Sequence, residues 1–360
     1  MKTYTGDMHE YIFENQKVIS NVIANHKQIT ESFLVAVTPE INMVYIVGAG
    51  TSNFSGKSVR SFFEKLTKIK TFVLLPTELT DDEYIIDKQT LVIGISATGS
   101  SANTIHALEK AKELGATTIA FTNDFDSPIG QKNEHKVFLD YGIEDVAPKS
   151  KSYITEMVTI CLCALDFGLK KGYISASIHD AYIARLMKTA ENMDYIAQAA
   201  DEWYYKHSEE FKKCERLLIV GYESNKGNIL EGALKILECG RFQVSSYELE
   251  EFMHGIYHSI DESCYLLFIS NNGKYFERSL QLKNYLSEFT SHQFVVCNEN
   301  NGFQDEKSLT LSFVEDDDFY PCEYIIPMQI IAYNIARDKG INPNKPSDPL
   351  FHQKMNSKFI

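Results

Sequence analysis

The sequence predicts an α/β protein made of two similar lobes, each a parallel sheet flanked by helices. Three observations lead to this prediction. Short apolar runs typical of buried strands alternate with amphipathic stretches of helical length, and this alternation occurs twice. The length of 360 residues suits two domains of ordinary size. The turns also recur in register, since Gly99 lies 51 residues after Gly48 and Gly273 lies 52 residues after Gly221. A duplicated unit explains all three observations.

Each predicted lobe contains three apolar strands that end in polar turns. In the first lobe these segments are NMVYIVGAGTSN, LVIGISATGS and TTIAFTND. In the second lobe they are ERLLIVGYESNK, YLLFISNNGK and HQFVVCNEN. Helical stretches lie between them: GKSVRSFFEKL and ANTIHALEKAKELGA in the first lobe, NILEGALKILEC and YFERSLQLKNYLSEF in the second. Alternation of this kind predicts parallel sheets.

The segments outside the lobes are predicted to be mostly helical. Residues 1–35 read as a long N-terminal helix, and residues 173–205 read as a helical linker with neither Gly nor Pro. The lobes are expected over residues 36–172 and 206–342. The C-terminal tail, residues 343–360, is rich in Pro and Asn and is expected to lie extended over the surface.

Composition and charge restrict the class of protein. Hydrophobic residues make up 44% and charged residues 23% of the chain, as in ordinary globular proteins. The net charge of −14 disfavours a broad nucleic-acid surface. The seven Cys show no C-x-x-C spacing, and the N-terminus does not read as a signal peptide, so we expect a reduced, cytoplasmic protein. No apolar run approaches 18 residues, so no membrane span is expected.

Hydroxyl side chains gather in two turns of the first lobe. The segments GAGTSN and SATGSS place six of them around Gly99 and the first strand end: Thr51, Ser52, Ser96, Thr98, Ser100 and Ser101. Ligands of parallel sheets bind beyond the carboxyl ends of the strands. A helix predicted to start near Ser101 or Asn103 adds free N–H groups and a positive dipole end, so the turns predict a phosphate site. Two alternatives remain: the hydroxyls only cap helices, or GAGTSN is a dinucleotide turn, although it lacks the third spaced Gly.

Charged side chains interrupt an otherwise apolar helix of the second lobe. Glu231 and Lys235 are four residues apart, and Lys235 and Glu238 are three apart, so all three share one helical face. A face of this kind is most often solvated and held by salt bridges. The apolar neighbours leave open the alternative that the charges are partly buried and used in catalysis.

Two histidines in the second lobe raise the question of a metal. His254 and His258 have i,i+4 spacing, and Glu250 or Glu251 could supply a third ligand, but no H-E-x-x-H order is present. We expect no metal and no cofactor. A single histidine at the edge of an active site could instead shuttle protons.

Three segments resemble the sugar isomerase (SIS) domain family: VGAGTSNFSG, ISATGSSANT and EGALKILECGRFQVSSYELEEFMHG. The resemblance covers nearly the whole chain as a tandem of two SIS-type lobes. It is closest to the isomerase half of glucosamine-6-phosphate synthase and to the fructosamine-6-phosphate deglycases. It implies that each lobe is a flavodoxin-like three-layer sandwich. It also implies a homodimer or a dimer of dimers, because in the family the active site forms where two subunits meet.

The resemblance implies roles for particular residues. The sugar phosphate would be held by Thr51, Ser52, Ser96, Thr98, Gly99 and Ser101. Further contacts with the sugar would come from Gly50, Ala97, Ala147 and Glu231, where Ala147 belongs to a loop, Glu144–Lys151, that matches the family loosely. Glu238 matches the general base that moves a proton between the first two sugar carbons, and Lys235 matches a lysine beside it. His254 matches the histidine that assists ring opening from the neighbouring subunit. Lys354, five residues after Pro349, has the spacing of a lysine that forms a Schiff base with the sugar.

The resemblance also implies an activity and leaves alternatives open. The chain starts directly with SIS-like sequence, so we expect it to lack a glutaminase domain and an internal ammonia source. This favours a deglycase that cleaves a fructosamine 6-phosphate to a sugar 6-phosphate and an amine. An aldose–ketose isomerase, an amino-sugar phosphate deaminase and a non-catalytic sugar-phosphate sensor are the alternatives. The sequence departs from the family at Ser100, where an acid is common, and at Ala97, where a larger side chain often contacts the substrate. We expect a small-molecule sugar phosphate as ligand, with neither nucleic acid nor membrane as partner.

Overall fold

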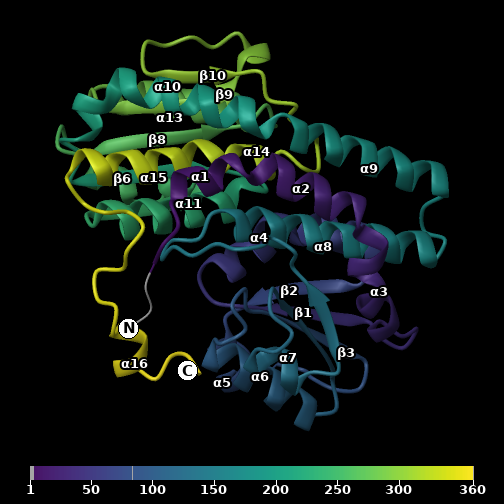
Figure 1. The fold of residues 1–360 in the computed structure, drawn as a ribbon. Helices are drawn as coiled ribbons and strands as arrows, with labels where there is room; N and C mark the ends of the chain where they lie inside the picture. The colour runs from purple at the N-terminus through teal and green to yellow at the C-terminus, as the bar shows by residue number, and fades with distance from the viewer. Residues whose placement is uncertain (1–3, 83, 360) are drawn as a thin grey trace.

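The structure is a computed structural model that describes residues 4–82 and 84–359, and in that part of the chain it contains two five-stranded parallel sheets (Figure 1). The first sheet consists of β1 (Met43–Val47), β2 (Lys70–Leu74), β3 (Thr90–Ile95), β4 (Thr117–Thr122) and β5 (His135–Phe138). The second consists of β6 (Arg216–Gly221), β7 (Gln243–Glu248), β8 (Tyr265–Ser270), β9 (Gln293–Asn298) and β10 (Ser308–Leu311). The predicted α/β fold with two parallel sheets is confirmed.

The two sheets have the same topology. Their strand orders are β2-β1-β3-β4-β5 and β7-β6-β8-β9-β10. β1 pairs with β3 in parallel register, and β6 pairs with β8 in the same way. Since parallel neighbours end at the same edge of a sheet, the turns after β1 and β3 lie next to each other. The turns after β6 and β8 do so in the second lobe.

Helices flank both sheets and connect the lobes. The first lobe contains α4 (Thr51–Thr67), α5 (Pro76–Asp81), α6 (Ala102–Glu113), α7 (Pro128–Lys132) and α8 (Lys151–Lys170). The second contains α11 (Asn225–Gly240), α12 (Leu249–Phe252), η1 (Ile256–Ser259), α13 (Phe276–Leu286), η2 (Glu299–Asn301), α14 (Pro321–Tyr324) and α15 (Ile326–Asp338). Two long helices, α9 (Ala176–Glu191) and α10 (Met193–Phe211), lead from one lobe to the other.

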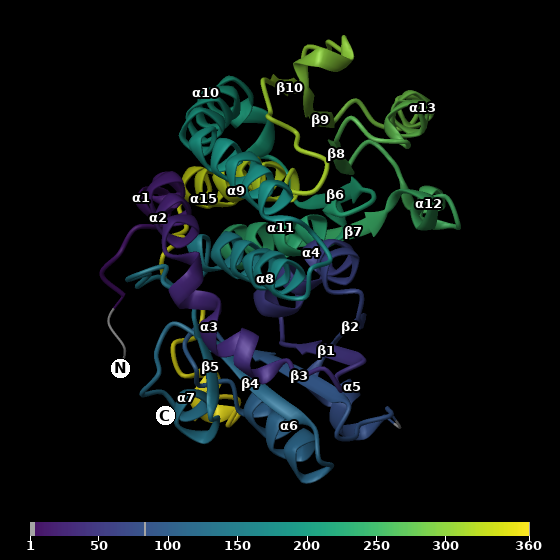
Figure 2. The ribbon, with the colours of Figure 1, turned by 90° about the vertical axis from the view of Figure 1, so that its right-hand side faces the viewer.

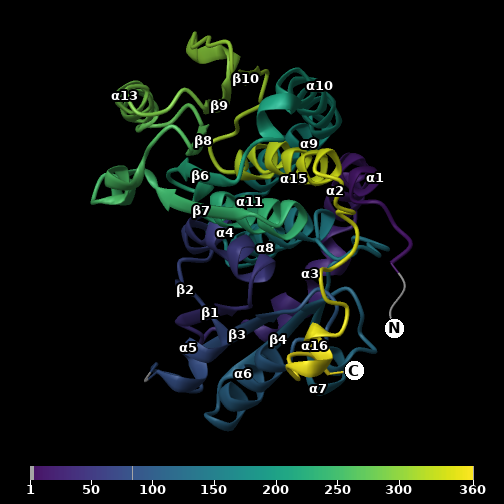
Figure 3. The ribbon, with the colours of Figure 1, turned by 90° about the vertical axis from the view of Figure 1, so that its left-hand side faces the viewer.

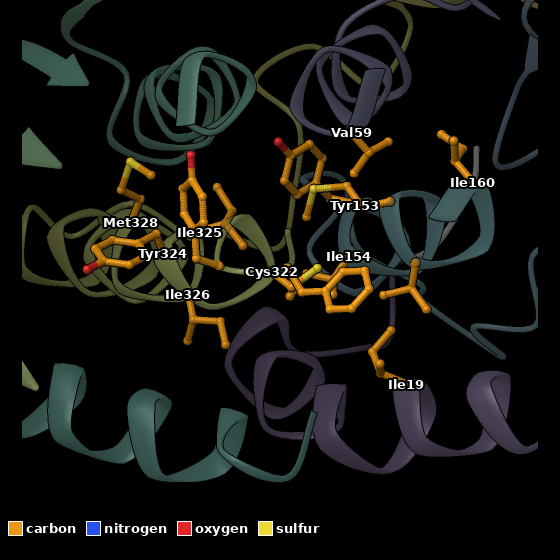
Figure 4. Close-up of a cluster of buried hydrophobic side chains, with 14 of the residues drawn as sticks. Ile19, Val59, Tyr153, Ile154, Ile160, Cys322, Tyr324, Ile325, Ile326 and Met328 are labelled. Carbon is orange, nitrogen blue, oxygen red and sulfur yellow. The ribbon is translucent and has the colours of Figure 1, made fainter. Parts of the chain in front are cut away.

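Four helices stack between the two sheets, as Figures 1 and 2 show. α4 packs on α8, α11 packs on α15, and α4 and α11 contact each other across the boundary between the lobes. The core continues through this boundary, because buried side chains of α2 (Asn15–Ala24), α4, α8, α14 and α15 lie together (Figure 4). Tyr153 on α8 spans the boundary with its hydroxyl, which is 3.0 Å from Ser58 Oγ and donates to Asn228 Oδ1 at 2.9 Å. The lobes are therefore fixed against each other by a shared core.

One helix, α8, is long and apolar enough to cross a membrane by length and composition alone. Its best window has a mean hydropathy of 1.4, and 94% of that window is buried inside the protein. Burial of this extent is typical of the central helix of a globular core, so this single helix is weak support for a membrane span.

The ends of the chain differ from the sequence-based expectation. The N-terminal segment forms three consecutive helices instead of one: α1 (Met8–Phe13), α2 (Asn15–Ala24) and α3 (His26–Ala36). The breaks fall at Glu14 and Asn25, and Asn is a residue type that favours helix ends over helix interiors. The tail is not simply extended, since it forms the short helix α16 (Phe351–Lys354) and descends to the first lobe beside α7 (Figure 3).

Candidate functional site

Two glycines shape the hydroxyl turns at the carboxyl edge of the first sheet. Gly50, directly before α4, has a φ of 57°, and Gly99, in the turn after β3, has a φ of 68°. This left-handed conformation is costly for other residues. A Cβ atom on Gly99 would also come within 1.8 Å of Ser127 Oγ. The turn after β3 therefore needs glycine for both conformation and space.

The hydroxyls of the turn after β3 lie in pairs. Ser96 Oγ donates to Ser101 Oγ at 3.1 Å, and Thr98 Oγ1 lies 3.0 Å from Ser100 Oγ. Ser101 is the N-cap of α6, as predicted, but its side chain caps no backbone N–H of that helix. The hydroxyls are thus not used up by helix capping and can turn toward a ligand. We call the turns Gly50–Ser52 and Ser96–Ser101 the cradle.

The C-terminal tail lies against the cradle. Ser101 and Lys358 form an antiparallel bridge, and Ala102 N donates to Ser357 O at 3.2 Å. Phe359 N donates to Ser100 O at 2.9 Å. The tail thereby covers part of the N-terminus of α6. The side-chain hydroxyls are then the main groups of this turn that can donate hydrogen bonds to an anion.

Helix α11 of the second lobe brings charged side chains to the first cradle turn. Thr51 Oγ1 donates to Glu231 Oε1 at 3.1 Å. Lys235 Nζ lies 3.6 Å from Glu231 Oε1 and donates to Glu238 Oε2 at 2.7 Å. Glu231 and Lys235 are buried, and the Glu238 side chain is 38% exposed. The three charges thus line the boundary between the lobes and do not form the solvated face that is usual for this spacing.

Burial and pairing give these charges different protonation preferences. Burial is the main reason that the pKa of Glu231 is raised to about 8, although Lys235 acts in the opposite direction. Burial lowers the pKa of Lys235, but Glu231 and Glu238 together outweigh it, so that pKa lies above its usual value. Oε2 of Glu231 has no hydrogen-bond partner among the described residues. A neutral Glu231 beside a charged Lys235–Glu238 pair is the arrangement expected near pH 7.

A further carboxyl group, which the sequence analysis did not identify, lies beneath the cradle. Ser52 Oγ donates to Glu156 Oε1 at 3.0 Å, and Ser55 Oγ donates to Oε2 at 2.8 Å. Glu156 is fully buried on α8, and burial outweighs these hydrogen bonds and raises its pKa to about 7. The only local signal in the sequence is an acid inside an apolar helix, which does not indicate what the acid contacts.

A cavity of about 430 Å³ adjoins the cradle. Ala97 and Thr98 line it on one side, and Tyr141, Glu144 and Lys149 belong to the opposite side. Its volume is in the range of sites for small organic ligands. The cradle therefore opens onto space for a molecule larger than a phosphate ion.

No hydrogen bond or ion pair among the described residues joins three further predicted site residues to the cradle or to the charged side chains of α11. His254 follows α12 on the outer side of the second lobe (Figure 2), is exposed, and its side chain makes no hydrogen bond to any described residue. Lys354 on α16 is paired with Asp348 at 2.8 Å, and its side chain is 60% exposed. Ala147 lies in the loop before α8, where its N–H donates to Asn344 O at 3.0 Å.

The potential metal ligands that lie together are not those considered from the sequence. Within residues 4–82 and 84–359 they are His26, Asp166 and His179, all buried. His26 Nδ1 lies 2.9 Å from one Asp166 oxygen, and His179 Nε2 lies 2.7 Å from the other. Thr30 Oγ1 also donates to Asp166 at 2.5 Å. Hydrogen bonds satisfy this carboxylate from three directions and hold α3, α8 and α9 together.

Comparison with known proteins identifies the class of this chain. Residues 40–165, which include β1 to β5 and most of α8, match the family model of the SIS domain. The second sheet repeats the topology of the first. The chain therefore contains a SIS domain, and its second lobe repeats the sheet topology of that domain.

Particular relatives agree with this classification. The chain is 26% identical over 336 residues to the isomerizing glutamine–fructose-6-phosphate aminotransferase of Caldanaerobacter subterraneus subsp. tengcongensis, covering 91% of this chain and 53% of the relative. The chain thus spans about half the length of the curated relatives it matches. A Clostridium difficile 630 protein, provisionally named a phosphosugar isomerase, has a TM-score of 0.93 at 25% identity and covers 99% of both chains. The C-terminal domain of glucosamine-fructose-6-phosphate aminotransferase from Francisella tularensis has a TM-score of 0.83 at 19% identity, covering 96% of this chain and 99% of that domain.

Proposed function

We propose that this protein is a phosphosugar enzyme that moves a proton between the first two carbons of an open-chain sugar 6-phosphate. The observation that carries this proposal is the continuous set of contacts from Thr51 through Glu231 and Lys235 to Glu238. These contacts join the cradle, whose hydroxyls suit an anion, in one lobe to a partly exposed carboxylate in the other. The names of the relatives, which are a sugar-phosphate aminotransferase and a phosphosugar isomerase, support the same class of substrate.

The proposed mechanism assigns one task to each group. The cradle hydroxyls donate to the phosphate and fix the sugar. Glu238 accepts the proton from C1, since a positioned carboxylate is a suitable general base. Lys235, held positive by its ion pair with Glu238, stabilises negative charge that develops on the oxygen at C2.

We further propose that the substrate is a ketoamine, which makes the protein a deglycase. After Glu238 removes the C1 proton, protonation at C2 gives an imine at C1. Water then adds to the imine and releases the free amine and glucose 6-phosphate, so one water is consumed for each amine formed. The cavity beside Thr98 supports this choice, because it offers room for an amine substituent beyond the sugar.

Ring opening requires a further proton donor, and we propose that it comes from a second copy of the chain. His254 is exposed on the outer side of the second lobe, where it can reach a neighbouring molecule. A homodimer would then complete each site with the histidine of the other subunit. Light scattering should show a dimer or larger assembly, and an active monomer would contradict this part of the proposal.

The test is turnover on a panel of phosphosugars. Amine release should occur from fructosamine 6-phosphates such as fructoselysine 6-phosphate, and exchange of the C1 proton in deuterated water should accompany it. Interconversion of fructose 6-phosphate and glucose 6-phosphate, or ammonia release from glucosamine 6-phosphate, without amine release from any ketoamine would instead identify an isomerase or a deaminase. Tight binding without any proton exchange would identify a sugar-phosphate sensor and would overturn the enzymatic proposal.

A further inference from the structure

The buried carboxyl group of Glu156, beneath the cradle, accepts the hydroxyl hydrogen that Ser52 would need in order to donate to a phosphate. A serine hydroxyl has one hydrogen to donate. In the structure Ser52 donates it to Glu156 Oε1 at 3.0 Å. A charged Glu156 would also repel a phosphate dianion bound on the other side of Ser52. This hydrogen bond therefore conflicts with a phosphate that accepts the hydrogen of Ser52.

Protonation of Glu156 removes both obstacles. A neutral carboxyl group can donate its own hydrogen to Ser52 Oγ, and Ser52 is then free to donate to the phosphate. Ser55 Oγ, 2.8 Å from Oε2, can keep donating to the remaining carboxyl oxygen. We propose that Glu156 is a positioning residue that takes up one proton when a phosphosugar binds, so that Ser52 turns its hydroxyl hydrogen toward the phosphate. This inference rests on the proposed function only in taking a phosphosugar as the ligand.

The surroundings of Glu156 favour uptake of that proton. The ionisable groups that face it are Tyr153 on its own helix, Tyr141 and Glu144 from the loop before α8, and Glu231 and Lys235 from α11. Lys235 is the one cation among them, and it is already held by Glu231 and Glu238. Glu144 accepts hydrogen bonds from the backbone of Ser150 and Lys151 and adds negative charge.

The side chain of Glu156 has no access to water that could stabilise its charge. It is fully buried, and burial is the main reason that its pKa is raised to about 7. An arriving phosphate dianion raises the pKa further, because like charges disfavour ionisation. Phosphate esters are largely dianionic above pH 7, so the ligand itself takes up few protons there.

Calorimetry measures the proposed proton directly. Fructose 6-phosphate and inorganic phosphate are titrated into the full-length protein at pH 6.5, 7.5 and 8.5, in two buffers with different heats of ionisation. The wild-type protein should take up close to one proton per ligand at pH 8.5, and its affinity should fall by about tenfold per pH unit above pH 7.5. Glu156→Gln can donate to Ser52 at every pH, so it should take up no proton at pH 8.5 and bind fructose 6-phosphate equally well at pH 7.5 and 8.5.

Two further variants separate this role from a general effect on the fold. Glu323 on α14 is another buried acid whose pKa burial raises to about 7, but its hydrogen bonds are with Asn192, Val314 and Glu315, away from the cradle. Glu323→Gln should keep the wild-type pH dependence of binding. Ser52→Ala removes the hydroxyl that links Glu156 to the ligand and leaves only the charge repulsion, so it should take up clearly less than the wild-type proton even if Glu156→Gln fails to fold.

The outcomes distinguish this inference from the proposed function. Phosphosugar binding by the wild-type protein without proton uptake overturns the role of Glu156 and leaves the proposed function intact. Proton uptake that persists in Glu156→Gln, or that is undiminished in Ser52→Ala, also overturns it. Absence of binding for every phosphosugar of the panel overturns the proposed function, and this inference with it.

Discussion

The two lobes have the same sheet topology, but the loops at their carboxyl edges differ. In the first lobe Gly50 leaves the turn after β1 open, with a φ of 57°. In the second lobe Glu223 occupies the equivalent place, two residues after the strand-end glycine, with a φ of 54°. Asn271 Nδ2 donates to Glu223 Oε2 at 3.0 Å, and Glu315 accepts from the backbone N–H of Asn272. The second lobe thus places its own carboxylates where the first lobe has room for an anion.

The helices that follow the first strand of each lobe also differ, and here the second lobe carries the group of charged side chains. On α11 the residues 10, 14 and 17 positions after Gly221 are Glu231, Lys235 and Glu238. On α4 the residues at the same distances from Gly48 are Ser58, Phe62 and Lys65. The first lobe therefore carries the hydroxyl-rich loops that suit an anion, and the second lobe carries the helix with the charged side chains. A repeated fold gives two equivalent positions for each feature, and each lobe contributes one half of the candidate site.

The largest effect is expected from the charged helix of the second lobe. Glu238→Gln removes the proposed base, so turnover should fall by about 10²- to 10⁴-fold while phosphosugar affinity changes little. The matched control is Lys65→Gln at the equivalent position of α4. Lys65 pairs with Asp318 at 2.8 Å, but its side chain is 51% exposed, so losing this pair should leave turnover unchanged. Equal losses in the two variants, measured as initial rates, would contradict the division of labour between the lobes.

Buried acids are present in both lobes, and they predict how stability depends on pH. Burial raises the pKa of Glu156 to about 7, of Glu231 to about 8 and of Glu323 to about 7. In the unfolded chain these acids lose their protons near pH 4.5, while the folded protein keeps them to higher pH. The folded state therefore binds more protons between these values, and the free energy of unfolding falls as pH rises from about 5 to 8, on the order of 3 kcal/mol for each of the three acids.

Thermal unfolding without ligand at pH 5, 6.5 and 8 measures this decrease. The net charge of −14 also disfavours the folded state as pH rises, but salt screens surface charges and leaves buried groups largely unaffected. The decrease in midpoint should therefore persist in 0.5 M salt. A midpoint that is constant or rises between pH 5 and 8 in high salt would show that the buried acids ionise normally.

The loop difference can be tested by giving the first lobe the residue of the second. Gly50→Glu should weaken phosphosugar binding by at least about 100-fold, because the new carboxylate would project into the cradle. A Cβ on Gly50 would lie 3.6 Å from its nearest neighbour, Leu234, so the new side chain has room, although the φ of 57° strains the backbone of any residue other than glycine. Gly50→Ala is the control for this backbone strain, and in calorimetry it should bind phosphosugar more tightly than Gly50→Glu. Equal losses for Ala and Glu would show that the backbone, and not the charge, determines binding.

The features that could be predicted from sequence are those with local signals. Strand–turn–helix periodicity predicted the three central strands of each five-stranded sheet and missed the edge strands, and the start of α6 after Ser101 was predicted within one residue. Contacts between distant segments could not be predicted in this way. Glu156 lies 104 residues from Ser52 along the chain, and Asp166 lies 140 residues from His26. Each of these acids is set in an apolar helix, and only the packing of that helix determines which side chain it meets.

The hydroxyls of the two strand-end loops offer a smaller test. Ser96→Ala removes one donor from the cradle, so the KM for a phosphosugar should rise by about tenfold with little change in kcat. The matched position in the second lobe is Ser270, three residues before Gly273, whose Oγ lies 2.8 Å from Ser279 Oγ. Ser270→Ala should leave KM unchanged. If both variants raise KM alike, the second-lobe loop also contacts the ligand.

The smallest effect is expected from giving the second lobe the residue of the first. Glu223→Gly removes the backbone strain of a non-glycine residue with positive φ, which stabilises the fold by about 1 kcal/mol. It also loses the hydrogen bond from Asn271 and gives the unfolded chain more backbone freedom, and both of these effects destabilise the fold. These contributions nearly cancel, so the free energy of unfolding should change by less than about 1 kcal/mol. Phosphosugar should still bind once per chain, because Glu315 continues to accept from Asn272 N and, of the hydroxyls of Ser96–Ser101, the loop keeps a counterpart only for Ser96, in Ser270. Two phosphosugars bound per chain in calorimetry would mean that Glu223 alone closes a second, otherwise competent cradle.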